Sequence, residues 1–431
     1  MAEGSKASKS KLAAWRGKYP TVASLEPVAR RRVPYFVFDF LQGGTGDEVS
    51  RPRNHKALAE IEIVPRYCTD VSGIDTAATL FGRRYSAPLV MAPIGMDGAI
   101  WPGATRHLAA AAQEMGLAHM SSTMATASIE DVAAIAPDSA WFQLYGIPGE
   151  DHRISFDLMR RADEAGAHVL AVTVDIPLPA RRVRDMRNGV SLPFSYSPKA
   201  VLGTLMRPRW LAALVRHGMP SFPNFAPYGT HDASGDIHGF VAQSKAGSGI
   251  DWDLLARMRD KWPRALVVKG ILHPNDARRA KALGMDGIIV SNHGGRQFDA
   301  APAPVDLVPV IREAVSDDMT VLMDGGVMSG LDMAKAMAVG ADGVLVGRGF
   351  MLGLAALGQY GAHHVASILM DEFRIALGQT GVCGIEGLRS LSLRQPGRWH
   401  MKDFGEEAEG MRQIPPAAEV IHPSRRKLVS G

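Results

Sequence analysis

Eight short apolar runs constrain the fold of this chain more than any other feature of its sequence. Each run is rich in Val, Ile, Leu and Met and ends in a polar residue or a glycine. The runs are apolar throughout rather than at every second position, which is typical of strands buried on both faces of a parallel sheet. They cover residues 89–93, 118–121, 140–145, 168–175, 265–270, 286–292, 319–325 and 342–348.

Helix-like segments with a 3.6-residue apolar period lie between most of these runs. Four of them are 104–116, 157–167, 274–285 and 330–341, and each closes on a glycine where a helix C-cap is expected. Eight alternating strands and helices predict a TIM (β/α)8 barrel, an α/β fold. The predicted organisation is an N-terminal helical segment that packs on the barrel, the barrel itself, a long insertion after its fourth strand and a C-terminal extension. Their residues are 1–85, 86–390, 190–250 and 391–431.

The composition of the 431 residues fits a folded protein with a sizeable core, since 46% are hydrophobic and 21% are charged. The two cysteines, Cys68 and Cys383, are too few for a disulfide framework or a metal cluster, so we expect no metal site and a cytoplasmic location. The first residues lack the continuous apolar region of an export signal, so secretion is not expected, and no apolar stretch is long enough for a spanning helix. The formal net charge of +4 is mild, and a nucleic-acid partner is not expected.

The carboxyl ends of the seventh and eighth runs are rich in glycine. They read Asp324-Gly325-Gly326 and Gly347-Arg348. Glycine turns at these two places of a barrel let backbone N–H groups approach an anion, and an arginine adds a forked donor. The pattern predicts a phosphate site, although tight turns that need a positive φ would explain either glycine motif alone.

Proton-transfer chemistry is indicated after the sixth run, where His293 and Arg296 stand three residues apart. An imidazole titrates near neutral pH and can accept a proton, and a guanidinium can bind a carboxylate through two parallel hydrogen bonds. Asp175, at the end of the fourth run, could orient that imidazole. Lys269 ends the fifth run inside apolar sequence, so its ammonium needs a negative partner, either a neighbouring carboxylate or a reduced flavin.

Several of these motifs together resemble the FMN-dependent 2-hydroxy acid dehydrogenase and oxidase family. The resemblance covers roughly residues 15 to 390, and its most specific motif is SNHGGRQ (291–297). It rests also on 141–145, 173–188, 266–270, 324–326 and 340–348. Within the family, the chain looks most like a membrane-associated mandelate or lactate dehydrogenase. The resemblance implies FMN as cofactor, an (S)-2-hydroxy acid as substrate, a quinone or other electron carrier as acceptor, and a homotetramer.

Site residues follow from the resemblance position by position. His293 becomes the base and Asp175 its partner, Arg296 and Arg182 bind the substrate carboxylate, and Tyr145 contacts the hydroxyl or the carboxylate. Two electrons leave the substrate either as a carbanion's pair or as a hydride, and the residues do not decide between these routes. The expected cofactor-binding residues are Pro93, Ile94, Gly95, Ser122, Gln143, Thr173, Lys269, Ser291, Asp324, Gly325, Gly326, Gly347 and Arg348.

Two positions matter for how the family's chemistry is carried out here. Phe40 stands where the family usually has a tyrosine that donates to the substrate carboxylate, so this chain lacks that hydrogen bond. Gly95 stands where glycolate oxidases tend to carry alanine, which favours a dehydrogenase over the alternative, an oxygen-using oxidase. A different FMN- or phosphate-binding barrel enzyme is the first rival interpretation, and a non-catalytic binding barrel is the second.

Residues 195–225, inside the predicted insertion, contain no acidic residue. Lys199, Arg207, Arg209 and Arg216 are interspersed there with Trp210 and with several leucines. Such a segment suits a helix in the headgroup region of an anionic membrane, and a lid or an oligomer contact would use the same residues. We therefore expect the protein to lie on the inner face of the plasma membrane, and removal of residues 200–225 to release it while flavin binding is kept.

Overall fold

The computed structural model describes residues 14–190, 197–229, 239, 241, 243–397 and 399. The first residues of the chain, part of the predicted insertion and almost all of the predicted C-terminal extension lie outside this described part. Statements about the predicted membrane segment therefore begin at Ser197.

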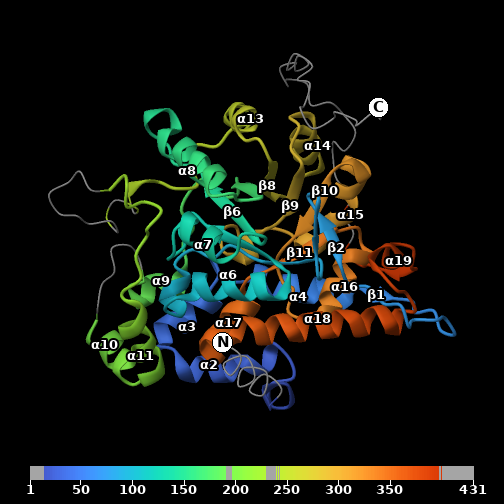
Figure 1. The fold of residues 1–431 in the computed structure, drawn as a ribbon, viewed down its shortest axis with the longest axis horizontal. Helices are drawn as coiled ribbons and strands as arrows, with labels where there is room; N and C mark the ends of the chain where they lie inside the picture. Colours follow the sequence, from blue (N-terminus) through green and yellow to red (C-terminus); the bar gives the residue numbers. More distant parts are fainter. Residues whose placement is uncertain are drawn as a thin grey trace, which may run out of the picture. The chain divides into compact units, whose positions relative to one another are not determined.

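Eight parallel strands close into a barrel at the centre of the described chain (Figure 1), which confirms the predicted TIM barrel. The hydrogen-bonded order is β10-β11-β4-β5-β6-β7-β8-β9, so strands consecutive in sequence are also neighbours in the barrel. The strands are β4 Leu89–Met91, β5 Ala118–Ser122, β6 Ala140–Tyr145, β7 Val169–Thr173, β8 Ala265–Ile271, β9 Gly287–Val290, β10 Thr320–Met323 and β11 Gly343–Val346.

All eight apolar runs became barrel strands because their side chains are buried on both faces. Every residue of β4, β5, β7 and β9 is buried, for example. Five strands are two or three residues shorter than the predicted runs, mainly because the polar residues at the carboxyl ends of those runs form the turns of the barrel rim. Those turns bring the predicted site residues together.

Helices surround the barrel in the connections between its strands. The four predicted helices end next to glycines with positive φ, at Gly116, Gly166, Gly284 and Gly340, as the C-cap pattern predicted. The helices that follow barrel strands are α5 Asp97–Ile100, α6 Ala104–Met115, α7 Ile129–Ile135, α8 Arg153–Glu164, α9 Val183–Asn188, α13 Trp252–Lys261, α14 Pro274–Ala282, α15 Pro304–Val315, α16 Gly330–Ala338, α17 Arg348–Leu357, α18 Gly361–Thr380 and α19 Ile385–Arg389.

The amino-terminal end of the barrel is closed by a hairpin of β2 (Ala78–Leu80) and β3 (Arg83–Tyr85). Leu80 and Tyr85 pack into the same buried cluster as residues of the barrel strands. The indole Nε1 of Trp141 donates a hydrogen bond to the Tyr85 hydroxyl at 3.0 Å. Because side chains fill the amino-terminal end of the barrel, a cavity is expected at the carboxyl ends of its strands.

The segment before the barrel is not wholly helical, in contrast to the prediction for residues 1–85. It contains the helices α2 (Glu26–Arg32), α3 (Tyr35–Gln42) and α4 (Ser50–Glu60), but also the β2–β3 hairpin and β1 (Glu62–Ile63). Strand β1 pairs with β12 (Leu393–Arg394). Helix α2 packs on α17, and α4 packs on α15 and α16, so the segment covers the side of the barrel that β9–β11 and their helices form.

Two helices of the insertion are described, α10 (Pro198–Leu205) and α11 (Pro208–His217). They pack on each other, and α10 also packs on α3, which in turn packs on α9 (Figure 1). None of the described helices combines the length and the apolar character that a membrane span requires.

Candidate active site

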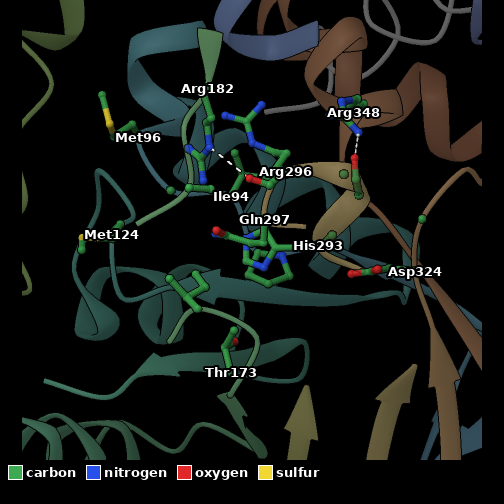
Figure 2. A pocket seen from close by; sticks show the side chains of 18 of the residues that line it. Ile94, Met96, Met124, Thr173, Arg182, His293, Arg296, Gln297, Asp324 and Arg348 are labelled. Atoms are coloured by element: carbon green, nitrogen blue, oxygen red, sulfur yellow. Dashed lines mark hydrogen bonds between the residues drawn. The ribbon is translucent and has the colours of Figure 1, made fainter. Parts of the chain in front are cut away.

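A cavity of about 780 Å³ lies at the carboxyl ends of the barrel strands. Residues from the rim of nearly every strand line it, and Figure 2 shows them converging from different parts of the barrel. Of the predicted site residues, all but three line the cavity. Asp175, Ser122 and Ser291 instead lie behind its wall and bond to residues that do.

His293 is held in place by the carboxylate of Asp175. The imidazole Nδ1 lies 3.0 Å from Asp175 Oδ1, and the backbone N–H of His293 donates to Ser291 Oγ at 3.0 Å. Because an ionised carboxylate only accepts hydrogen bonds, Nδ1 carries the proton and the lone pair of Nε2 remains available. His293 also has a φ of 56°, which is uncommon for a residue with a Cβ and typical of a constrained functional position.

The electrostatics of this pair favour a neutral imidazole and an ionised carboxylate. Burial lowers the pKa of His293, and the attraction of Asp175 offsets this only in part. Asp175 is buried too, but His293 and Lys269 together hold the pKa of that carboxyl below its ordinary value. At neutral pH His293 can therefore accept a proton, and Asp175 stabilises the imidazolium that results.

Arg296 reaches the same cavity from the turn after β9, and Arg182 reaches it from the start of α9 (Figure 2). The guanidinium of Arg296 donates to the carbonyl oxygens of Phe40 and Gly43, both at 2.8 Å. Its nearest carboxylate, that of Asp185, is 3.9 Å away. Two buried or half-buried guanidinium groups with one loosely placed carboxylate leave excess positive charge, which suits an anionic ligand.

Asp185 is a site residue that the sequence reasoning missed. It is buried, lines the cavity, and has a pKa raised by burial despite the nearby Arg296 and Arg182. A signal was present, because Asp185 follows Arg182 by three residues and the two therefore share one face of a helical turn. Its carboxylate is the acidic group nearest to the Arg296 guanidinium, at 3.9 Å.

Tyr145 and Phe40 form the aromatic part of the site. The Tyr145 hydroxyl lies 3.5 Å from His293 Nε2, and burial together with Asp175 raises the pKa of this phenol to about 12. Tyr145 is therefore a protonated donor at neutral pH. Phe40 lines the cavity, and its ring centroid lies 5.0 Å from the Arg296 guanidinium carbon. Phe40 therefore makes a cation–π contact with Arg296, whereas a tyrosine at this position could donate a hydrogen bond.

Lys269 has the carboxylate partner that the sequence left open as one of two alternatives. Its ammonium lies 2.8 Å from Asp324 Oδ2 and donates to Ser291 Oγ at 2.7 Å. Burial disfavours the charged form, but Asp324 and Asp175 outweigh this and raise the pKa of Lys269. Lys269 therefore stays protonated, is paired with the Asp324 carboxylate and lines the cavity.

Five buried side-chain atoms on the cavity wall have no hydrogen-bond partner among the described residues. Three are oxygens of Asp185, Gln297 and Asp324, and the other two are the Nε2 amide of Gln143 and the hydroxyl of Thr173. Ser122 fixes the amide by donating to Gln143 Oε1 at 2.8 Å, which leaves Nε2 as a donor directed at a ligand. Buried polar groups are normally satisfied, so the Gln143 and Thr173 atoms fit the polar edge of a bound flavin ring.

The glycine turns occupy the other end of the cavity. Gly325 and Gly326 have φ values of 93° and 96°, and a Cβ on Gly326 would lie 2.9 Å from the backbone oxygen of Asn54. Both reasons for glycine, positive φ and close approach, are therefore present. The Arg348 guanidinium, labelled in Figure 2, was expected to face a phosphate, but three of its N–H groups donate to the carbonyl oxygens of Leu41, Gly43 and Gly294.

Apolar side chains form the wall opposite Arg348, where Met96 and Met124 are seen in Figure 2. A Cβ on Gly95 would come within 3.0 Å of Met124 Cβ, so these two positions are in direct contact across the wall. Further apolar lining comes from the loop after β7 and from the insertion, including Ile176, Pro177, Leu178, Met186, Val190 and Phe222.

Comparison with known proteins finds a matching family model and related sequences. The family model for FMN-dependent dehydrogenases matches residues 29–395. The chain is 38% identical over 369 residues to L-lactate dehydrogenase of Caulobacter vibrioides. The match covers 85% of this chain and 95% of that protein. It is 36% identical over 376 residues to (S)-mandelate dehydrogenase of Pseudomonas putida, and this match covers 87% of this chain and 94% of that protein.

A solved structure agrees with these sequence matches. The crystal structure of the monotopic membrane protein (S)-mandelate dehydrogenase superposes with a TM-score of 0.81 at 36% identity. The match covers 87% of this chain and 99% of that chain. The likeness therefore includes the barrel and the rim that carries the cavity.

Proposed function

The chain belongs to the FMN-dependent dehydrogenase family, and on that premise we propose that it oxidises an (S)-2-hydroxy acid with an apolar side chain to the 2-oxo acid, with His293 as base. FMN is the cofactor of this family and, when bound, supplies the acceptor for the two electrons that the substrate loses. The observation that carries the proposal is the convergence of a neutral imidazole and two guanidinium groups on one cavity.

Substrate binding begins with the carboxylate. Arg296 and Arg182 supply the positive charge, and the carbonyls of Phe40 and Gly43 fix the direction in which Arg296 presents its remaining N–H groups. Tyr145 is protonated and adjacent to His293, so it can donate to the substrate hydroxyl or to the carboxylate.

Proton removal is the task of His293. Its Nε2 accepts a proton from the bound acid, while Nδ1–H stays hydrogen-bonded to Asp175. The Asp175 carboxylate therefore stabilises the positive charge that develops on the ring. The cavity does not distinguish removal of the hydroxyl proton from removal of the α-proton, and both routes use the same nitrogen.

The residues around the cavity fit the parts of FMN. Gln143, Thr173, Ser122 and Lys269, with the backbone of Pro93, Ile94 and Gly95, would hold the ring, and Ser291 would act through Lys269. Asp324, Gly325, Gly326, Gly347 and Arg348 would hold the ribityl chain and the phosphate. The two unpartnered atoms of Gln143 and Thr173 support this placement. The charge of Lys269 would stabilise negative charge on a reduced ring.

The experiment is a spectrum of the purified protein followed by anaerobic addition of (S)-mandelate or L-lactate. Yellow protein that bleaches on addition of either acid supports the proposed reaction. Yellow protein that does not bleach with a range of 2-hydroxy acids would indicate a binding barrel instead. Colourless protein that takes up no FMN would contradict the cofactor assignment.

We also propose that the protein attaches peripherally to the inner face of the plasma membrane through α10 and α11 and passes electrons to a quinone. Leu202, Leu205, Met206, Val215 and Met219 are largely exposed on and next to these helices, and Arg209 and Arg216 are exposed beside them. An apolar surface with a cationic rim suits the headgroup region of an anionic bilayer. The relative titled a monotopic membrane protein supports the same proposal.

Slow reoxidation of the reduced flavin by air, with fast reoxidation by a soluble quinone, is the expected behaviour. Rapid reoxidation by air would favour the alternative, an oxygen-using oxidase. The homotetramer implied by the resemblance stays a prediction, and light scattering of the purified protein measures it.

A further inference from the structure

Three basic side chains, two arginines and a histidine, gather at the end of the cavity that holds the glycine turns. Arg51 and His55 come from α4, one helical turn apart, and Arg348 begins α17 after β11. All three line the cavity together with Gly325 and Gly326. Neither α4 residue was predicted from the sequence, because α4 precedes the barrel and is far from its strand ends in the chain.

Helix α4 is held directly against the glycine turn. A Cβ on Gly325 would lie 3.0 Å from Asn54 Nδ2, and one on Gly326 would lie 2.9 Å from Asn54 O. The side chain of Asn54 exchanges hydrogen bonds with Asn292 at 2.8 and 2.9 Å, which ties α4 to the turn after β9. His55 and Gly326 line the same end of the cavity. Arg51 and His55 are therefore fixed beside the turn.

The positive charge of this cluster is not balanced within the described part of the chain. Neither Arg51, His55 nor Arg348 has a carboxylate within ion-pair distance there. The carboxylates near this cluster already form ion pairs with other side chains, Glu48 with Arg184 and Asp324 with Lys269. Burial, followed by the neighbouring cations, lowers the pKa of His55, and burial together with Arg51 lowers that of Arg348 to about 10.

Donor groups remain free on these side chains. A guanidinium has five N–H groups. Arg348 uses three of them on backbone carbonyls, and Arg51 uses one on the carbonyl of Gln42 at 3.0 Å. Two N–H groups of Arg348 and four of Arg51 therefore remain to donate to a ligand. The two arginines together offer more donors than Arg348 alone.

We propose that Arg51 and His55 of α4 bind the phosphate of FMN together with Arg348, so that the segment before the barrel completes the cofactor site. The proposal rests on the proposed function, since it requires that FMN be the cofactor. A phosphate monoester carries about −1.5 to −2 charges near neutral pH, and more than one cation is needed to neutralise it. Arg51 supplies the second guanidinium, and His55 adds a donor next to the glycine turn.

The test compares FMN with riboflavin, which has the same ring and ribityl chain but no phosphate. The full-length protein is freed of flavin, and each flavin is titrated by its fluorescence quenching. The variants are Arg51→Gln and His55→Gln, and the matched control is Lys56→Gln, an exposed cation on the same helix. We expect Arg51→Gln to weaken FMN binding about 10- to 100-fold and His55→Gln about 3- to 10-fold. Riboflavin affinity should stay within about twofold in every variant.

Two results would overturn the inference while leaving the proposed function intact. The first is FMN affinity of Arg51→Gln and His55→Gln equal to that of Lys56→Gln. The second is an equal loss of FMN and riboflavin affinity, because that pattern means that α4 is needed only for the shape of the site. Wild-type protein that binds neither flavin would overturn the proposed function itself, and the inference with it.

Discussion

The barrel rim and the α10–α11 surface use arginine and apolar side chains in opposite ways. At the rim the guanidinium of Arg296 is buried, oriented by two backbone carbonyls and aimed into a cavity. On α10 and α11, Arg209 and Arg216 are exposed and large apolar side chains such as Val215 face outward, with 80% of that residue accessible. Buried, fixed charge suits recognition of one small anion, whereas exposed charge beside apolar surface suits an extended anionic layer.

The two regions are also connected, which changes how they can be separated by experiment. Trp210 is buried and donates through its indole to the carbonyl of Ile100 at 3.0 Å, so it does not lie in a headgroup layer. Asn224 is buried and donates to the carbonyls of Ser122 and Thr123 at the rim. Phe222 lines the cavity itself. Removal of residues 200–225 is therefore expected to disturb the rim, so for that deletion we now predict weakened flavin binding rather than flavin binding that is kept.

The largest effect is expected for His293→Asn. Loss of the base should lower kcat by about 10²- to 10⁴-fold with FMN still bound, because general base catalysis contributes that range. Steady-state turnover measures the loss, and the flavin spectrum checks that the cofactor is in place. The matched control is His363→Asn, which removes another histidine paired with a carboxylate, Glu114, outside the cavity. Equal activity of the two variants would contradict the assignment of His293.

The second effect separates the α10–α11 surface from the rim without a deletion. The triple variant Leu202→Gln, Leu205→Gln and Val215→Gln changes only exposed apolar residues. Each side chain that enters the bilayer fully contributes about 1.5 to 3 kcal/mol, so partition into anionic vesicles should fall at least about 100-fold. Flotation measures the partition, and kcat with a soluble acceptor should not change. The control Leu331→Gln alters an exposed leucine of α16; unchanged flotation of the triple variant would leave the surface to a lid or an oligomer contact.

The third effect is a displaced pH profile, and it tests the His293–Asp175 pair. The base is active when neutral, and its pKa is lowered by burial, so kcat/KM should fall only below the ordinary histidine range of about 6.5 as the pH drops. Asp175 raises the pKa of His293, whereas Lys269 and Arg182 lower it. Asp175→Asn removes the raising influence, so the acid limb should move to still lower pH while kcat decreases. A limb that moves to higher pH would contradict this charge arrangement.

The smallest effect is expected at Phe40, whose ring stacks near Arg296 in the cavity wall. Phe40→Tyr adds a donor beside the carboxylate site, and a net hydrogen bond is worth about 0.5 to 1.5 kcal/mol, so KM should fall about 3- to 10-fold. Steady-state kinetics with a simple 2-hydroxy acid measure it. Phe36→Tyr is the control, since Phe36 lies on the same helix but does not line the cavity. An unchanged or higher KM for Phe40→Tyr would show that position 40 does not face the carboxylate.

The sequence predicted those parts of the molecule that depend on local pattern. The eight runs became strands because burial on both faces requires apolar residues at consecutive positions. The pairing of His293 with Asp175 was also predicted, since both follow barrel strands and must meet at one rim.

Features that depend on long-range partners could not be predicted in the same way. No local pattern shows that Arg348 donates to carbonyls of Leu41, Gly43 and Gly294, or that Arg51 approaches a turn almost three hundred positions later in the chain. Trp210 looked like a headgroup residue in sequence, and only its contact with Ile100 places it inside the fold. Side-chain direction is set by tertiary packing, which composition does not record.

A crystal structure of the protein with FMN and an unreactive 2-hydroxy acid analogue would test the central claim most directly. We predict that the carboxylate of the analogue is bound by Arg296 and Arg182 and that its α-carbon lies between the flavin ring and Nε2 of His293. A carboxylate bound elsewhere, or an imidazole turned away from the α-carbon, would contradict the account.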